Sequence, residues 1–220
     1  MRKETVGNCE LYLGDCLELM ARYPDKHFDL AIVDPPYGMG CHHQNNKQIK
    51  GIKGYSYGSR EKMAQWDKPP EPEYFNQLFR VSNYQIIFGG NYFRLPPKRN
   101  FIIYYKSNIP EGFNMAACEY AWTNIKGNAS IFSYFLKPDP GRIHPTQKPA
   151  ALYKWLLSKY AEPGQKILDT HLGSGTHAAA CYEMGFPLTA CEIDEYYFTA
   201  AVERLRLFAA QTVLDFGGAE

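Results

Sequence analysis

The residues best suited to chemistry in this chain are Asp34, Pro35, Pro36 and Tyr37, which follow one another directly. They come after a short apolar run, Phe28–Val33, which we expect to be a buried strand. The prolines lack backbone N–H groups and cannot continue that strand, so an acid and an aromatic ring are left at its end. Ligands bind outside the carboxyl ends of the strands in open α/β sheets, which makes this tetrapeptide a candidate catalytic site. A proline turn with a capping Asp is the alternative.

A second candidate site lies at Asp169–Thr176, where a strand is expected to pass through a glycine turn into a helix. Gly173 and Gly175 let the backbone approach a ligand at the helix N-terminus. Glu192 ends the next expected strand about 20 residues later, where an acid can hold ribose hydroxyls. Ala178 stands where a dinucleotide fingerprint has its third glycine, and no Lys follows the glycines as in a phosphate loop. Two acids around such a turn suit a nucleoside that bears a cation, such as S-adenosylmethionine, and a tight turn packed with small residues is the alternative.

The elements that must position these residues alternate between strands and helices. Hydrophobic periodicity and turn residues predict strands at 10–14, 28–33, 84–88, 101–106, 119–123, 129–136, 166–169 and 188–191, and helices at 15–22, 73–80, 150–160, 176–184 and 195–210. Lys166–Cys191 reads strand, helix, strand, which is a βαβ unit and therefore predicts a parallel sheet.

Length and composition predict one globular domain over residues 1–220, with a net charge of +1 and so no global basic field. The six cysteines form no CxxC pair, which favours reduced thiols in a cytoplasmic protein over a zinc cluster or a disulfide framework. Cys41, His42 and His43 lack a fourth ligand at a recognisable spacing, so no metal is expected. No signal peptide or membrane span is expected either.

Taken together, these segments resemble the DNA amino-methyltransferases, which methylate the exocyclic amine of adenine or cytosine. Residues 34–37 match the catalytic tetrapeptide of that family, residues 169–176 its cofactor loop, and residues 191–194 the acidic strand end. Ile143–Pro149 is similar to the segment that closes over the methionine end of the cofactor, and Gly14–Cys16 to the segment beside its adenine. The tetrapeptide precedes the cofactor loop, which is the permuted order of the β-class.

The resemblance implies an α/β, Rossmann-like fold of S-adenosylmethionine-dependent methyltransferases, with a circularly permuted motif order and a mostly parallel sheet covered by helices on both faces. It also implies a direct transfer of the methyl group from S-adenosylmethionine to a base flipped out of duplex DNA. Asp34 and the Pro35 carbonyl would draw the lone pair of the amine out of conjugation, and Tyr37 would stack on the base. Asp at the first position of the tetrapeptide favours adenine N6 over cytosine N4. The short chain is typical of a small phage or prophage enzyme.

On the cofactor side, the resemblance implies that Glu192 binds the ribose hydroxyls and Asp15 the adenine amine. Thr146, Gln147 and Lys148 would hold the methionine end; a proline-rich entry to a helix is the alternative for their segment. The implied set is Asp15, Cys16, Thr146, Gln147, Lys148, Asp169, His171, Gly173, Ser174, Gly175, Thr176, Glu192 and Ile193. His171 departs from the family, which has Phe there.

The segment Gly38–Trp66 has no helical or strand period, and its basic residues outnumber its acids. Lysines and arginines neutralise phosphates, and tyrosines among glycines can stack on bases, so we expect this loop to bind double-stranded DNA. A solvated loop is the alternative. The candidate DNA-binding residues are Lys47, Lys50, Lys53, Tyr55, Tyr57, Arg60 and Lys62.

A small target-recognition region is expected around residues 107–140, and a homodimer is common in the family. Three other functions stay open at this point: an N4-cytosine DNA methyltransferase, an RNA or protein methyltransferase, and a non-catalytic nucleic-acid-binding relative.

Overall fold

The structure is a computed structural model that describes residues 1–38, 68–110, 115–137, 139, 141–144 and 146–216. The strands are β1 (Arg2–Val6), β2 (Cys9–Leu13), β3 (Phe28–Val33), β4 (Ser82–Phe88), β5 (Phe101–Lys106), β6 (Cys118–Thr123), β7 (Ser130–Tyr134), β8 (Ile167–Asp169) and β9 (Leu188–Glu192). The helices are α1 (Cys16–Met20), α3 (Pro72–Val81), the short 3₁₀ turn η2 (Gly90–Tyr92), α4 (Ala150–Tyr160), α5 (Thr176–Met184) and α6 (Glu195–Phe216).

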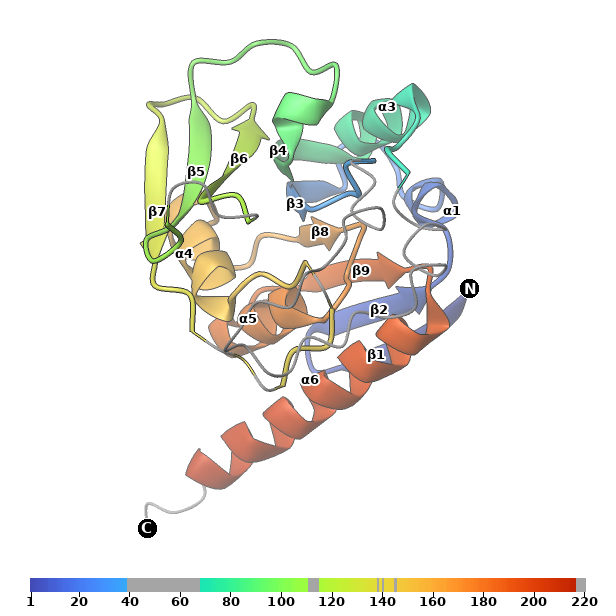
Figure 1. Ribbon diagram of the computed structural model, residues 1–220. Helices are drawn as coiled ribbons and strands as arrows, with labels where there is room; N and C mark the ends of the chain where they lie inside the picture. Colours follow the sequence, from blue (N-terminus) through green and yellow to red (C-terminus); the bar gives the residue numbers. More distant parts are fainter. Residues whose placement is uncertain (39–67, 111–114, 138, 140, 145, 217–220) are drawn as a thin grey trace.

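Within the described residues the strands form one sheet in the order β1-β2-β9-β8-β3-β4-β6-β5-β7 (Figure 1). The neighbours from β2 to β4 are all parallel, and β5 is parallel to β7. The strands β1 and β6 run in the opposite direction to their neighbours. The expected mostly parallel sheet is confirmed.

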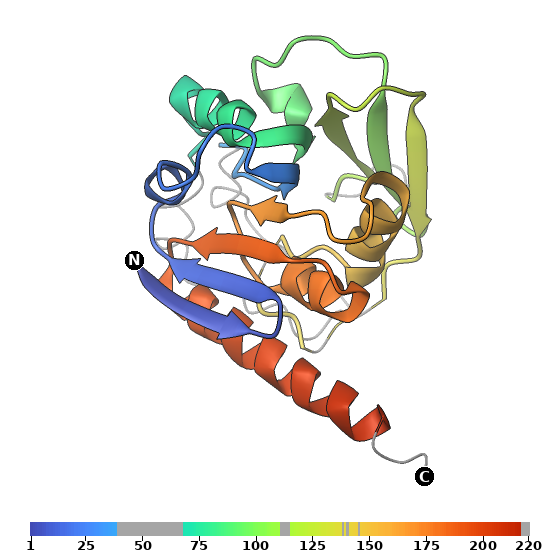
Figure 2. The same ribbon diagram turned by 180° about the vertical axis from the view of Figure 1, so that it is seen from behind.

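Helices cover both faces of the sheet, as the resemblance implied. The short helices α1 and α3 pack on one face through Leu19, Met20, Leu78 and neighbouring apolar side chains. The other face is covered by α4, α5 and α6, seen from behind in Figure 2, and α6 continues beyond the body of the sheet. Each face of the sheet therefore has its own apolar core, and the central strands are buried on both sides, which explains their continuous apolar runs.

Most predicted elements lie within two residues of the observed ones, and three features differ. Strand β1 was not expected, because its Arg2, Lys3 and Glu4 give no apolar run. In the described part of the chain it pairs with β2 alone and forms an edge of the sheet. The turn η2 was not expected either, and α6 extends six residues past the predicted end at residue 210, to Phe216.

The predicted DNA-binding residues all fall in the segment 39–67, outside the described residues, and so does the Cys41-His42-His43 group. They are Lys47, Lys50, Lys53, Tyr55, Tyr57, Arg60 and Lys62. Their role stays a prediction. In the described part of the chain, no helix combines the length and the apolar character needed to cross a membrane. The same part of the chain contains no group of three His, Cys, Asp or Glu side chains arranged to hold a metal ion.

Candidate functional site

The candidate residues meet because parallel strands end at the same edge of the sheet. In the sheet, Val33 of β3 is paired with Ile87 of β4, and Ala31 of β3 is paired with Leu168 of β8. Asp34, which follows β3, and the glycine turn, which follows β8, therefore come after adjacent strands at the same edge of the sheet. Strand β9 ends at Glu192 beside Leu13 of β2, so Asp15 and Glu192 lie further along the same edge.

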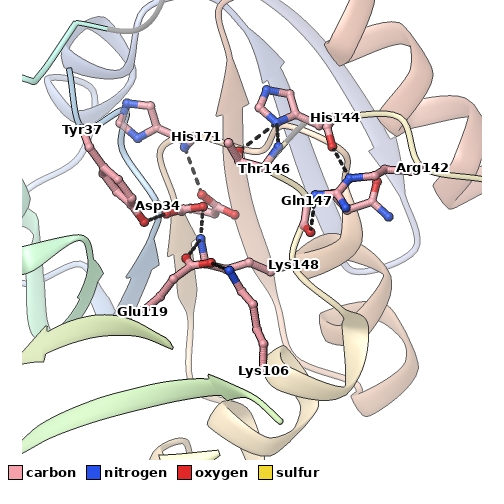
Figure 3. Close-up of polar contacts among 11 residues, drawn as sticks. Asp34, Tyr37, Lys106, Glu119, Arg142, His144, Thr146, Gln147, Lys148 and His171 are labelled. Carbon is pink, nitrogen blue, oxygen red and sulfur yellow. Dashed lines mark hydrogen bonds and ion pairs between the residues drawn. The ribbon is translucent and has the colours of Figure 1, made fainter. Parts of the chain in front are cut away.

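Asp34 is held by two partners of different kinds. The Tyr37 hydroxyl donates a hydrogen bond of 2.6 Å to Oδ1, and the Lys148 ammonium pairs with Oδ2 (Figure 3). Tyr37 itself lies against Gly89, which has a φ of +68° and whose missing Cβ would overlap the ring. Tyr92 stacks on Tyr37 with ring centroids 5.1 Å apart and an interplanar angle of 21°. A left-handed glycine just after β4 thus creates the space in which the Tyr37 ring lies.

Lys148 belongs to a row of alternating charges. Its Nζ lies 3.1 Å from Oε2 of Glu119, at the start of β6, and Oε1 of Glu119 lies 2.7 Å from Nζ of Lys106, at the end of β5. Because β6 runs against β4, its first residues lie at the edge where the parallel strands have their carboxyl ends. Lys148 reaches the same edge from the chain segment before α4.

The pKa values of Asp34, Glu119 and Lys148 are shifted from their usual values. Burial raises the pKa of Asp34 above its usual value, against the opposing effect of the Lys148 ammonium. Burial would also raise the pKa of Glu119, but Lys148 and Lys106 outweigh it and hold that pKa at about 2. Burial lowers the pKa of Lys148, yet the two carboxylates more than compensate and raise it. Lys148 is therefore a cation at neutral pH, and Glu119 is ionised.

The glycine turn is held by backbone hydrogen bonds. Gly173 and Gly175 have φ values of +54° and +74°. The Glu192 carboxylate accepts from the N–H of Gly173 at 2.8 Å and from the N–H of Asp194 at 3.0 Å. The side chain of Glu192 therefore ties the turn after β8 to the end of β9. Ile193, the next residue, is 65% exposed.

Asp169 lies beneath this turn rather than open to it. One oxygen accepts from the His171 N–H at 2.9 Å, and the other lies 2.9 Å from Nδ1 of His177, which is buried on α5. The Tyr153 ring stacks on His177 at 4.6 Å. His171 packs edge-on against Tyr74, and burial lowers its pKa to about 4. Because that pKa lies well below neutral, the ring is neutral at pH 7, which suits the position where the family has Phe.

The segment before α4 splits in two directions. Oγ1 of Thr146 lies 3.0 Å from Nδ1 of His144, and the His144 ring packs edge-on against Tyr197 of α6. Gln147 accepts at Oε1 from the Ile143 N–H and from Arg204 of α6. Lys148 turns the other way, into the charge row at Asp34. The segment thus contacts Asp34 of the candidate tetrapeptide as well as α6.

The structure therefore brings most sequence candidates to one edge and leaves their individual roles as predictions. The Asp15 side chain caps α1, accepting from the N–H groups of Leu17 and Glu18. Burial raises the pKa of Cys16 to about 12, so its thiol stays protonated. The site residues that sequence reasoning missed are Lys106, Glu119, His177 and Arg204. The available signal for Lys106 and Glu119 was a charge at the end of an otherwise apolar strand.

Comparison with known proteins gives one consistent picture. A family model described as DNA methylase matches residues 114–203. YubD of Escherichia coli (strain K12), a protein named as a methylase, is 24% identical over 225 residues, covering 94% of this chain and 93% of that protein. The solved complex of M1.HpyAVI with SAM has a TM-score of 0.57 and 21% identity, over 90% of this chain and 98% of that one. The cytosine-N4-specific PvuII DNA methyltransferase has a TM-score of 0.58 and 13% identity, over 94% of this chain and 93% of that one. The expected methyltransferase fold and the resemblance to DNA amino-methyltransferases are confirmed.

Proposed function

We propose that this chain, a relative of the DNA amino-methyltransferases, transfers the methyl group of S-adenosylmethionine to the N6 amine of adenine in duplex DNA. One observation carries the proposal: the Asp34 tetrapeptide and the Gly173–Gly175 turn follow adjacent parallel strands, β3 and β8. This arrangement supports the proposal, because the proposed amine acceptor and the proposed cofactor turn then share the edge where α/β folds bind ligands.

The residues around the turn fit S-adenosylmethionine. Each Glu192 oxygen already accepts one backbone N–H and keeps a second lone pair, which can accept from a ribose hydroxyl. The exposed apolar side chain of Ile193 offers a surface for a flat base. No Lys or Arg follows the glycines within α5, so the turn lacks the cation that a phosphate loop uses. When bound, the cofactor supplies an electrophilic methyl group.

Asp34 and Pro35 would prepare the amine for attack. The lone pair of an aromatic amine is delocalised into the ring, and two acceptors on its hydrogens, the Asp34 carboxylate and the Pro35 carbonyl, would localise it on nitrogen. The nitrogen would then bond to the methyl carbon while the carbon–sulfur bond breaks and leaves its electron pair on sulfur, and the proton lost by the nitrogen would pass to the Asp34 carboxylate and from there to solvent. Alignment of the reacting atoms supplies much of the remaining acceleration.

Tyr37 is suited to hold a flipped base. Tyr92 is 49% exposed and lies nearly parallel to the Tyr37 ring. This existing aromatic contact supports a role for the Tyr37 ring as a stacking partner. A base outside the duplex is typically held by such aromatic contacts. We assign the basic segment 38–66 to the DNA backbone and the region around 107–140 to target recognition, both from the sequence.

The test is product identification. Purified protein is incubated with tritiated S-adenosylmethionine and duplex DNA, structured RNA or protein, and the labelled DNA is digested to nucleosides and separated. We expect label in N6-methyladenine from duplex DNA. Label confined to RNA or protein would contradict the proposal, and absence of S-adenosylmethionine binding by calorimetry would favour a non-catalytic relative.

An N4-cytosine activity is the second candidate, because the fold is also similar to that of the cytosine-N4-specific PvuII enzyme. The tetrapeptide begins with Asp, which favours adenine by resemblance to the family. The same nucleoside separation distinguishes the two, since N4-methylcytosine and N6-methyladenine elute separately.

A further inference from the structure

The charge row beside the tetrapeptide joins residues that lie far apart in the sequence. Asp34 follows β3, Lys148 precedes α4, Glu119 is the second residue of β6 and Lys106 is the last residue of β5. Figure 3 shows Lys148 between the two carboxylates. The Lys148 side chain is only 3% exposed and that of Asp34 16% exposed. Such a row is more than a surface ion pair, because solvent hardly reaches its centre.

The order of the charges makes each member depend on the next. Two carboxylates and two ammonium groups alternate, so each buried charge faces an opposite one. Lys148 also lies over the ring of Phe88, with Nζ 4.5 Å from the centroid. Its ammonium is thus fixed from three sides and cannot follow Asp34 if that side chain moves. A buried charge that loses its partner is strongly unfavourable, so the whole row resists rearrangement.

We propose that Lys148, Glu119 and Lys106 are positioning residues for the transfer: Glu119, anchored by Lys106, fixes the Lys148 ammonium, which holds the Asp34 carboxylate ionised and in one orientation. The proposal rests on the proposed function and changes the role expected for Lys148. Instead of holding the methionine end of the cofactor, Lys148 positions the Asp34 carboxylate. Lys148 pairs with Oδ2 of Asp34, and the Tyr37 hydroxyl donates to Oδ1, so Oδ1 is directed toward Tyr37. Oδ1 is then the atom that accepts from the target amine.

The geometry predicts opposite effects for the two neighbours of Asp34. Lys148 lowers the pKa of Asp34 and Glu119 raises it. Among the described residues, the hydroxyls of Tyr37 and Tyr153 also interact with Asp34, and burial raises the pKa of both well above the usual value, so they stay neutral. Removing the charge of Lys148 must therefore move the titration of Asp34 to higher pH, and removing that of Glu119 must move it to lower pH. The opposite pair of shifts follows from the positions of the two charges, and the pH profile of kcat shows whether the titration of Asp34 also governs the transfer.

The experiment compares Lys148→Met, Lys148→Arg and Glu119→Gln in the full chain. We expect Lys148→Met to lower kcat at least about 10-fold, since a small misplacement of a catalytic group is costly. Lys148→Arg, which keeps the charge, should retain more activity. The acid limb of the pH profile of kcat should move up in Lys148→Met and down in Glu119→Gln. The affinity for S-adenosylmethionine, measured by calorimetry, should stay within about twofold in each variant.

A second readout does not depend on methylation. The ¹³C carboxyl signal of Asp34, assigned by its loss in Asp34→Asn, should titrate at higher pH in Lys148→Met and at lower pH in Glu119→Gln. Glu119→Gln keeps the shape of the side chain and so keeps the test available if Lys148→Met does not fold. The matched control is Lys154→Met, which removes an α4 lysine paired with Glu183 at the surface and should change nothing.

Two results would overturn the inference: an unchanged Asp34 titration in both variants, or a loss of cofactor affinity larger than the loss of kcat, which would return Lys148 to the cofactor. A wild-type protein that methylates no DNA would contradict the proposed function alone, because the carboxyl titration is read without substrate.

Discussion

The two ends of the candidate site, one after β3 and the other after β8 and β9, are held together by different kinds of interaction. At β3, the Asp34 carboxylate is held by the Lys148 ammonium and the Tyr37 hydroxyl. Glu119 of β6 pairs with that ammonium and is itself paired with Lys106 of β5. At β8 and β9, the Glu192 carboxylate is held by two backbone N–H groups of nearby turns. A carboxylate held by a buried charge depends on distant elements, whereas one held by amides depends on local backbone geometry. Changes at the first end should therefore affect catalysis, and changes at the second should affect cofactor affinity and loop stability.

The largest expected effect is at Asp34. Asp34→Asn keeps the shape of the side chain and removes its charge, so the amine loses its strongest acceptor and kcat should fall by about 10²–10⁴-fold. Binding of S-adenosylmethionine should stay within about twofold. Initial rates with tritiated cofactor, together with calorimetry, check both values. If Asp34→Asn lost cofactor affinity but kept kcat, the proposed division into a catalytic end and a cofactor-binding end would be wrong.

Glu192 should show the reverse pattern. Both oxygens of Glu192 accept a backbone N–H in the wild-type protein. In Glu192→Gln the NH₂ group replaces one of these acceptors, so it faces the N–H of Gly173 or Asp194 and that hydrogen bond is lost. We expect affinity for S-adenosylmethionine to weaken by about 10–100-fold, as for a lost hydrogen bond to a charged group, with kcat at saturation retained. The matched control is Glu195→Gln, which removes only an exposed partner of Arg2. Equal losses in the two variants would speak against a specific role for Glu192.

Gly175 tests the local geometry of the turn. Its φ is +74°, and an added Cβ would lie 2.9 Å from Cβ of Ala201 on α6. Gly175→Ala should lower the free energy of unfolding by about 2–3 kcal/mol, from left-handed strain plus crowding. Gly164→Ala is the control, because its φ is +85° with nothing within 4 Å of the added Cβ. Gly164→Ala should lower the free energy of unfolding by the left-handed backbone strain alone, about 1–2 kcal/mol. Denaturant unfolding of both variants measures the difference, and equal values would exclude crowding against α6.

The smallest effect concerns the pH dependence of stability at the cofactor turn. The folded-state pKa of His171 is lowered to about 4 from 6.5. As the pH falls below 6.5 the unfolded chain binds a proton that the folded chain does not, so His171 lowers the free energy of unfolding between pH 6.5 and about 4.

His171→Phe removes this contribution and should flatten the dependence by at most about 1 kcal/mol between pH 6.5 and 5.5. Thermal or denaturant unfolding at both pH values checks it. Some slope should persist, because burial also lowers the pKa of His144 to about 4. A steeper slope in the variant would mean that His171 is charged in the folded protein.

The part of the site around the cofactor turn could be predicted because its determinants are local. Strand β8, the glycines and α5 are consecutive, and the end of β9 follows within one βαβ unit, so the spacing of Asp169, Gly173 and Glu192 already fixes their neighbourhood. The same reasoning missed His177, because a histidine on an apolar helix face gives no sign of the acid beneath it. Strand β1 was missed because an exposed edge strand needs no apolar run.

The sequence alone determined the acid after β3, the prolines that end the strand, and the order of motifs that indicates the family. It also placed Lys148 in a recognisable segment, for which the resemblance implies a role at the methionine end of the cofactor, and that role stays a prediction. Only the tertiary structure decided that Lys148 reaches Asp34 and that Glu119 and Lys106 stand behind it. The physical reason is the reversed direction of β6: an antiparallel strand brings its first residues to the edge where parallel strands have their last, and no local pattern encodes that direction.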